Sequence, residues 1–160
     1  MSEQMRETTP VSRQIREHGP IKVAAWRLMM EKYQDFMTRF EHEFRTRHGL
    51  SANEFDVLIN ARFEDRVRQR DLLRSLVISR SALSSLLGKL EARGLVTQAA
   101  DPDDQRGVLV ALTEAGMTLC DEAAATNDEI ILAAFSGLTD AEAEEIFQLV
   151  AKIRPVGSSA

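Results

Sequence analysis

The sequence has almost no cysteine and no long apolar run, and these two absences exclude whole classes of protein. Cys120 stands alone, so the chain cannot form an internal disulfide, which agrees with a reducing compartment. No stretch of about 18 or more uninterrupted apolar residues exists, so we expect no helix that spans a membrane and no membrane partner. The first 20 residues also lack the apolar segment and small-residue cleavage motif of a secretory signal. We therefore expect a cytoplasmic protein.

Signatures of catalysis and of metal binding are missing as well. The chain has no glycine-rich phosphate loop, no nucleophile elbow and no pair of catalytic carboxylates, and "DPDD" (101–104) is typical of a turn. His42 and His48 are six residues apart, so they do not share a helix face as metal ligands at i and i+4 do. We therefore expect neither an enzyme nor a metal or cofactor site.

Acidic residues outnumber basic ones, but the imbalance lies at one end of the chain. The 160 residues, enough for one domain or slightly more, carry a net charge of −5. Residues 113–160 contain nine acidic and two basic side chains, whereas residues 61–98 contain eight basic and four acidic ones. A basic middle segment permits binding to nucleic acid despite the acidic total.

The N-terminal third predicts one long helix after a polar start. Residues 1–19 have no sustained apolar period, and we interpret them as a mobile arm or a short extra helix. Residues 20–48 have large apolar side chains at intervals of three and four, which predicts a helix with a wide apolar face. Most of this face suits a core, and part of it suits a second copy of the chain. The apolar positions are Trp26, Met29, Met30, Tyr33, Phe36, Met37, Phe40 and Phe44.

The C-terminal segment 113–154 predicts two further helices, followed by a tail at 155–160. One helical pattern runs from after Gly116 to about Phe135, and a second begins where Thr139 and Glu142 form a capping box. Leu138, Ile146, Leu149, Val150 and Ile153 give the second segment an apolar face. Apolar helices at both ends of the chain can interlock around a two-fold axis. We therefore expect both ends to form a dimerisation region.

The segment between these ends begins with two short helices. Ser51 and Glu54 form a capping box before a helix of about ten residues, and Leu50 is placed for a hydrophobic staple. A charged connector, "EDRVRQ", leads to "RDLLRSLVI", which predicts another short helix with buried leucines.

The next helix, residues 79–93, carries the strongest functional signal. Ser79 is its predicted N-cap, and Gly94 its left-handed stop. Leucines at i, i+3, i+4 and i+7 form one face, and the opposite face is short or basic. Exposed helix faces favour long Glu, Lys and Gln, so a serine-rich face indicates that a partner approaches closely, as base edges in a DNA major groove would. The leucines are Leu83, Leu86, Leu87 and Leu90, and the opposite face consists of Arg80, Ser81, Ser84, Ser85, Gly88 and Lys89.

Two β-prone runs follow, "LVTQAA" and "GVLVALT", with the turn "DPDDQR" between them. A helix-turn-helix followed by such a hairpin is a winged helix. We predict an α+β fold, mostly α with a small β-hairpin, in which a winged helix-turn-helix domain at 50–112, with its wing at 95–112, is flanked by dimerisation helices. Arg106 is predicted at the wing tip, where a guanidinium can enter the negative interior of a minor groove.

The acidic residues of the wing have predicted structural roles. Asp104 can accept hydrogen bonds from the guanidinium of Arg106 or from an arginine on a helix. Either bond would order the wing before DNA binds. Asp101 and Asp103 suit bonds to backbone amides of the turn, and Gly107 would permit the turn.

Three segments resemble the MarR family of bacterial winged-helix transcription regulators. They are "LSANEFDVLINARF", "SRSALSSLLGKLEARGLV" and the wing signature "DDQRGVLVALTEAG", and together they cover about residues 50–120. Gln98 stands where the family often has arginine, and Val77 where it often has glycine.

The resemblance implies a triangular homodimer that binds a pseudo-palindromic operator in double-stranded DNA. It also implies a repressor, released in many relatives by a small phenolic or lipophilic molecule bound between the two regions, and in others by cysteine oxidation. Cys120 does not match the usual position of the redox cysteine, so we expect it to be a small buried residue. Two alternatives stay open: a winged-helix protein-interaction module without DNA binding, and a thiol sensor acting through Cys120.

The residues assigned to the DNA-binding site share short or cationic side chains on the predicted helices and wing. The serines would meet base edges or nearby phosphates, Arg80 and Lys89 would add charge, and Arg70 and Arg74 would contact the backbone. The complete predicted set is Arg70, Arg74, Ser79, Arg80, Ser81, Ser84, Ser85, Lys89, Arg106 and Gly107, with Asp104 ordering the wing.

Overall fold

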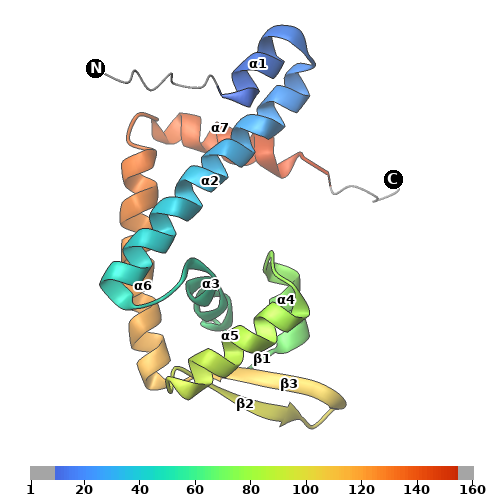
Figure 1. Cartoon of the computed structure of the whole chain (residues 1–160), viewed down its shortest axis with the longest axis vertical. Helices are drawn as coiled ribbons and strands as arrows, with labels where there is room; N and C mark the ends of the chain where they lie inside the picture. The colour runs from blue at the N-terminus through green and yellow to red at the C-terminus, as the bar shows by residue number, and fades with distance from the viewer. Residues whose placement is uncertain (1–9, 155–160) are drawn as a thin grey trace, which may run out of the picture.

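The computed structural model describes residues 10–154, and its elements confirm the predicted α+β class. Residues 1–9 of the predicted arm and the predicted tail at 155–160 lie outside the described residues. Figure 1 shows a helical arm (α1, α2, α6 and α7) and a lower lobe (α3, α4, α5 and a small sheet), with the lower half of α6 running down beside the lobe to the level of the sheet. The elements are α1 (Val11–His18), α2 (Ile21–His48), α3 (Ala52–Ala61), β1 (Val67–Arg68), α4 (Gln69–Ser75), α5 (Arg80–Ala92), β2 (Val96–Asp101), β3 (Asp104–Leu112), α6 (Glu114–Ala134) and α7 (Asp140–Ala151).

The predicted helix boundaries are set by side-chain caps. Ser51 and Thr139 form capping boxes with Glu54 and Glu142, and Ser79 accepts a hydrogen bond from the amide of Ala82. Gly94 has a φ of +72°, which confirms the left-handed stop after α5. The start of α6 differs from its prediction. Its cap is Thr113, so the helix begins at Glu114, before Gly116.

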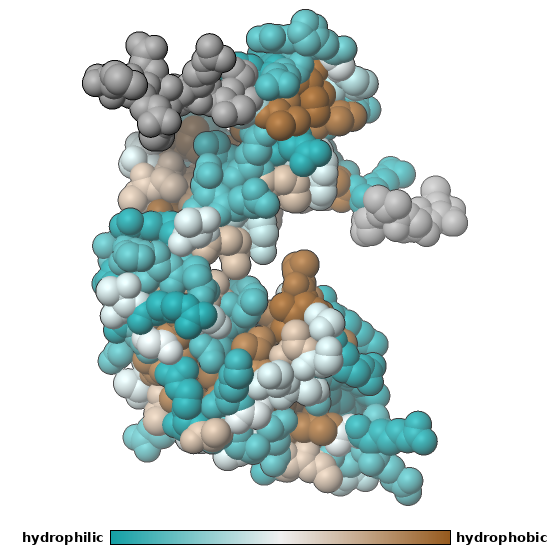
Figure 2. Space-filling model, in the orientation of Figure 1, coloured by the Kyte–Doolittle hydropathy of each residue, from teal (hydrophilic) through white to brown (hydrophobic). Residues whose placement is uncertain are grey.

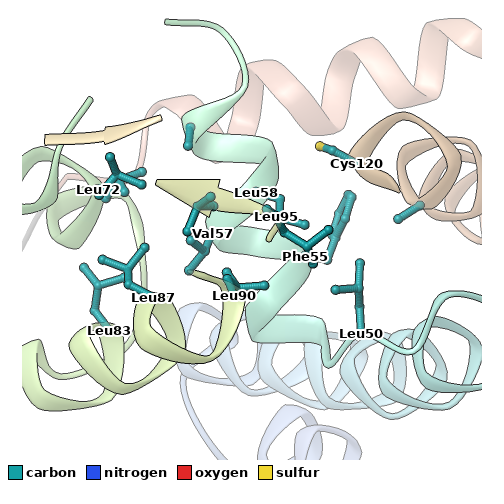
Figure 3. Packing of buried hydrophobic residues seen from close by; sticks show 14 of the residues in the cluster. Leu50, Phe55, Val57, Leu58, Leu72, Leu83, Leu87, Leu90, Leu95 and Cys120 are labelled. Carbon is teal, nitrogen blue, oxygen red and sulfur yellow. The ribbon is translucent and has the colours of Figure 1, made fainter. Parts of the chain in front are cut away.

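The lower lobe is built on the leucine face of α5. Leu83, Leu87 and Leu90 are completely buried, and they meet apolar residues of α3, α4 and the sheet (Figure 3). Leu50 and Phe55 are buried together at the start of α3, as the hydrophobic staple predicted. Burying one face of α5 in this way leaves its serine-rich face outside.

The sheet has one strand more than the sequence predicted. Its order is β1-β3-β2, all antiparallel, and the additional strand β1 pairs Val67 with Val110 and Arg68 with Leu109. A two-residue strand inside a charged connector has no alternating pattern to detect. The hairpin turn is also shorter than predicted, because β2 extends to Asp101 and β3 begins at Asp104.

The helical arm has a packed lower half and an open upper half. Phe36, Phe40 and Phe44 of α2 lie in contact along the helix, and Phe44 packs on Phe55 with ring centroids 4.6 Å apart. Above them, α1 folds back on α2, and the Ser12 amide and hydroxyl both donate to Glu31. Of the two interpretations of residues 1–19, the short helix is therefore correct for 11–18.

Large apolar side chains of α1, the first half of α2 and α7 are exposed. No residue of α7 is buried, although its sequence is amphipathic. None of the described helices combines the length and apolar character that crossing a membrane requires. The exposed side chains include Val11, Ile21, Val23, Trp26, Leu28, Ile146, Phe147, Leu149, Val150 and Ile153.

Gly116 of α6 lies close to the backbone of Leu95, the residue before β2. A Cβ at this position would lie 1.9 Å from the carbonyl oxygen of Leu95. We expect Gly116→Ala to lower the free energy of unfolding by about 3 kcal/mol, because the helix or β2 must move. Urea unfolding followed by circular dichroism measures this change.

Gly137→Ala is the matched control, because a Cβ there would meet nothing within 4 Å. We expect this control to remain within about 0.5 kcal/mol of the wild type. Equal stability of the two variants would show that α6 does not need the close approach.

Candidate nucleic-acid interface

The face of α5 opposite the leucines is exposed along its whole length. It presents three serines and a glycine between two cations, and a Cβ on Gly88 would meet nothing within 4 Å. The hydroxyl of Ser79 caps the helix and lies 3.1 Å from that of Ser81. The surface is therefore shallow and rich in hydroxyl groups. The exposed residues are Ser79, Arg80, Ser81, Ser84, Ser85, Gly88 and Lys89.

A groove of about 290 Å³ separates α5 from α4 and the wing, the hairpin of β2 and β3. The structure brings five of the predicted site residues together here, from all three elements. They are Arg70, Arg80, Ser84, Arg106 and Gly107, and Arg68, Gln69, Leu73, Asp101, Asp104 and Val108 complete the lining.

The other predicted residues lie outside the groove. Arg74 pairs within its own helix, at 2.9 Å from Asp71, and is largely exposed. Ser81, Ser85 and Lys89 occupy the open face of α5.

The wing is fastened to the lobe by Arg68, which sequence reasoning missed. Nε of Arg68 lies 2.6 Å from Oδ2 of Asp101, whose carboxylate is buried, and a second nitrogen lies 3.3 Å from Asp103. The other oxygen of Asp101 accepts from the Asp103 amide at 3.0 Å. The hydrogen bond from Arg68, and then that from the Asp103 amide, hold the pKa of Asp101 below its ordinary value. Arg68 went unnoticed because its partner is 33 residues away.

Asp104 makes a second connection between the wing and the helices. Its Oδ2 lies 3.2 Å from Nη1 of Arg70 on α4, and its Oδ1 accepts from the backbone amide of Arg106 at 3.1 Å. Of the two predicted partners, the helix-borne arginine is therefore the one that Asp104 binds. Asp104 makes no ion pair with the guanidinium of Arg106.

Arg106 is exposed, but it does not lie at the tip as predicted. It is the third residue of β3, and the turn consists of Pro102 and Asp103. No ion pair with the Arg106 guanidinium occurs among residues 10–154. The side chain therefore remains available to a partner, although it projects from the strand.

Gly107 has a different role from the one predicted. It belongs to β3, and its φ is not positive, so no turn depends on it. A Cβ at this position would lie 2.7 Å from Cβ of Asp101 and 3.1 Å from Cβ of Asp104. The glycine thus leaves the space in which both aspartates reach their arginines.

Comparisons with known proteins agree with this geometry. The family model described as "MarR family" matches residues 48–107. The multiple antibiotic resistance protein MarR of Escherichia coli (strain K12) is 31% identical over 84 residues, 52% of this chain and 58% of that protein. The match thus spans little more than half the length of this relative.

Two solved structures match over a longer range. A mutant MarR from E. coli complexed with operator DNA has a TM-score of 0.72 and 27% identity, covering 81% of this chain and 92% of that one. Bordetella bronchiseptica BpsR, whose DNA binding is regulated by 6-hydroxynicotinic acid, has a TM-score of 0.71 and 29% identity, covering 80% and 96%. The chain is therefore similar to MarR-family regulators in both sequence and fold. This similarity supports the resemblance read from the sequence.

Two positions depart from the MarR-family pattern, and the structure shows what each does here. Gln98 fastens β2 to the end of α5, because its amide and its side chain donate to the two carboxylate oxygens of Glu91 at 2.9 and 3.0 Å. Val77, between α4 and α5, is 94% exposed, so it takes no part in the core.

Cys120 does not have the surroundings of a reactive thiol. It is completely buried on α6 beside the core of the lower lobe (Figure 3), as predicted. Burial raises the pKa of its thiol to about 11, so the nucleophilic thiolate is scarce at neutral pH. His48 hydrogen-bonds Thr126 at 2.8 Å, and residues 10–154 contain no cluster of three or more candidate metal ligands.

Asp101→Asn tests whether the ion pair with Arg68 holds the wing. Because the folded-state pKa of Asp101 lies below its unfolded value, the carboxylate stabilises the fold above about pH 4, and this contribution is lost as the pH falls through the folded pKa. We expect the variant to have a lower free energy of unfolding than the wild type at neutral pH, and the difference to shrink in acid.

Urea titrations between about pH 7 and pH 3 measure the two free energies. Asp65→Asn, at an exposed position of the α3 to β1 connection, is the control and should show no comparable difference at any pH. A difference for Asp101→Asn that does not vary with pH would contradict an electrostatic role.

Proposed function

We propose that this protein is a regulator of the MarR type, which binds specific DNA sequences and acts as a homodimer. The supporting observation is the juxtaposition of a shallow, serine-rich helix face with a groove lined by Arg70, Arg80 and Arg106. A major groove about 12 Å wide admits α5, whose small side chains allow close approach to base edges. The exposed guanidinium of Arg106 then reaches the adjacent minor groove.

Each predicted site residue has a place in this arrangement. Ser81, Ser84 and Ser85 face bases or nearby phosphates, whereas Ser79 serves chiefly as the helix cap. The remaining contacts are electrostatic. Arg70, Arg74, Arg80 and Lys89 neutralise backbone phosphates, and the acidic helix α7 lies at the opposite end of the molecule from α5 (Figure 1).

Homodimerisation accounts for the exposed apolar residues of the helical arm. Trp26 and Phe147 are 53% and 68% exposed, and α7 buries none of its residues within one chain. A two-fold partner would cover these surfaces. Two winged helices related by that axis would read an inverted repeat with half-sites about one helical turn apart.

We further propose that the protein is a repressor that a small aromatic or lipophilic molecule releases. The support is its likeness to BpsR, whose DNA binding is regulated by 6-hydroxynicotinic acid. The space-filling view has a hollow between the helical arm and the lower lobe (Figure 2), so a molecule there would contact both parts. Occupation of the hollow would alter the spacing of the two winged helices.

Selection of bound sequences from a random duplex pool tests the function directly. Recovery of an inverted repeat by the purified protein, with affinity that falls steeply with salt, is the expected result. If a folded dimer enriches no sequence at low salt, sequence-specific DNA recognition is contradicted, and a protein-interaction module is favoured.

Arg106→Ala tests the wing on the selected duplex. We expect binding to weaken by about 1 to 3 kcal/mol, because one cation close to the DNA phosphates is lost. For the same reason, the slope of log affinity against log salt concentration should fall by about 0.9. Fluorescence anisotropy at several salt concentrations measures both quantities.

Arg45→Ala is the matched control, because Arg45 is an exposed arginine of α2 that pairs with Glu41 on the same helix. It should change neither quantity. Unchanged affinity and slope for Arg106→Ala would remove the wing from the mechanism.

Phe147→Glu tests the dimer surface. The substitution places a charge on a face that a partner would bury, so we expect the dimer to weaken by about 2 kcal/mol or more, roughly 30-fold in Kd. Analytical ultracentrifugation measures the Kd, and circular dichroism checks the fold.

Val77→Glu places the same charge on an exposed apolar position of the lower lobe and should leave the dimer intact. An unchanged Kd for Phe147→Glu would place the dimer surface elsewhere.

A further inference from the structure

One hydrogen bond joins the two helices of the helix-turn-helix through side chains that line the groove. Nε2 of Gln69, the first residue of α4, donates to Oγ of Ser84 on α5 at 2.8 Å. Ser84 is exposed and Gln69 is half-buried, so the glutamine supports the serine from behind. This bond fixes both the position and the polarity of the Ser84 hydroxyl.

A serine or threonine hydroxyl inside a helix often donates its hydrogen bond to the backbone carbonyl four residues earlier. Thr38, Thr46 and Thr118 make this bond, at 2.9, 2.7 and 3.1 Å. Within residues 10–154, Ser84 makes no such bond, and its hydroxyl bonds Gln69 alone. The O–H of Ser84 is therefore available to donate a hydrogen bond to a partner outside the protein.

Gln69 also makes this hydroxyl a stronger donor. A hydroxyl has one O–H to donate and two lone pairs with which to accept, and the Gln69 amide occupies one of the lone pairs. Accepting that bond polarises the O–H, because successive hydrogen bonds reinforce one another. Ser84 is thus biased towards donating.

We propose that Ser84 reads a hydrogen-bond acceptor on a base edge in the major groove, and that Gln69 is the positioning residue that sets this polarity. The acceptors available there are N7 of a purine, O6 of guanine and O4 of thymine. The exocyclic amino groups of cytosine and adenine are donors, so a Ser84 O–H directed at the base edge finds no acceptor in them. This inference rests on the proposed placement of α5 in the major groove.

Ser84 is distinguished from its neighbours by this support. Ser81 shares a hydrogen bond with Ser79, whose oxygen is already the helix cap, and Ser85 has no protein partner among the described residues. Only the Ser84 hydroxyl, of these three, is bonded to a residue of another helix. We therefore expect one position of each half-site to depend on the pair of Ser84 and Gln69.

Base preferences of four variants test this inference: Gln69→Ala, Gln69→Glu, Ser84→Ala and the double variant with both alanines. We expect Ser84→Ala to reduce discrimination at one half-site position by roughly 5-fold or more. Gln69→Ala should reduce discrimination at the same position, and the double variant should lose no more than Ser84→Ala alone.

Gln69→Glu gives the sharpest outcome, because an ionised carboxylate only accepts hydrogen bonds. It would accept a hydrogen bond from the Ser84 O–H and leave the lone pairs of that hydroxyl facing the groove. The preference at that position should then move towards cytosine or adenine amino groups. The measured quantity is the ratio of affinities for two duplexes, so a uniform loss of affinity from the added charge cancels.

Duplexes in which a 7-deazapurine replaces one purine identify the atom that Ser84 reads when that position is a purine. Loss of N7 should weaken the wild type and leave Ser84→Ala unaffected. Gln34→Ala, an exposed glutamine of α2, is the control and should keep the wild-type preferences. Circular dichroism verifies that each variant is folded.

Two results would overturn the inference while leaving the proposed function intact. One is full discrimination by Gln69→Ala, and the other is an effect of Gln69→Ala at positions that Ser84→Ala does not alter. A wild-type protein that selects no sequence would instead overturn the proposed function and this inference together.

Discussion

The candidate interface depends on the ion pair between Arg68 and the buried carboxylate of Asp101. This pair connects β1, which continues directly into α4, with the last residue of β2. Removing Arg68 would leave the buried Asp101 carboxylate without its cation, which is costly, so this pair holds the wing in place. Gly107 supplies the space for the pair, and Asp104 adds Arg70 from α4. In the proposed complex, the helices and the wing would therefore present their cations to a duplex with little reordering.

The sequence was sufficient wherever the determining interactions are local. Capping residues such as Ser51 and Thr139 act on amides three positions away, and the leucines of α5 repeat within a single helix, so both could be found by spacing. The exposure of the serine face of α5 follows from the same periodicity, because burying the leucines turns the serines outwards.

Interactions between distant segments could not be predicted in this way. Arg68 lies in a strand of two residues, too short for a pattern, and its partner is far along the chain. Arg106 was placed in the turn because "DPDDQR" reads as one loop, whereas pairing with β2 extends β3 back to Asp104. Gly107 and Gly116 likewise required the structure, because their neighbours, Asp101 and the Leu95 carbonyl, belong to other elements.

The ion pair between Arg70 and Asp104 affects the number of phosphate contacts that the salt dependence of DNA binding would indicate. A cation that binds a phosphate normally displaces a condensed counterion, which gives protein–DNA affinity its salt dependence. Arg70 already has a counterion of its own in Asp104. If Arg70 binds a phosphate in the proposed complex, Asp104 is left to attract a cation from solution, which offsets part of the counterion release. The number of phosphate contacts deduced from salt dependence would therefore be lower than the number formed. Arg70 would contribute less to the salt slope than an arginine without a partner in the protein.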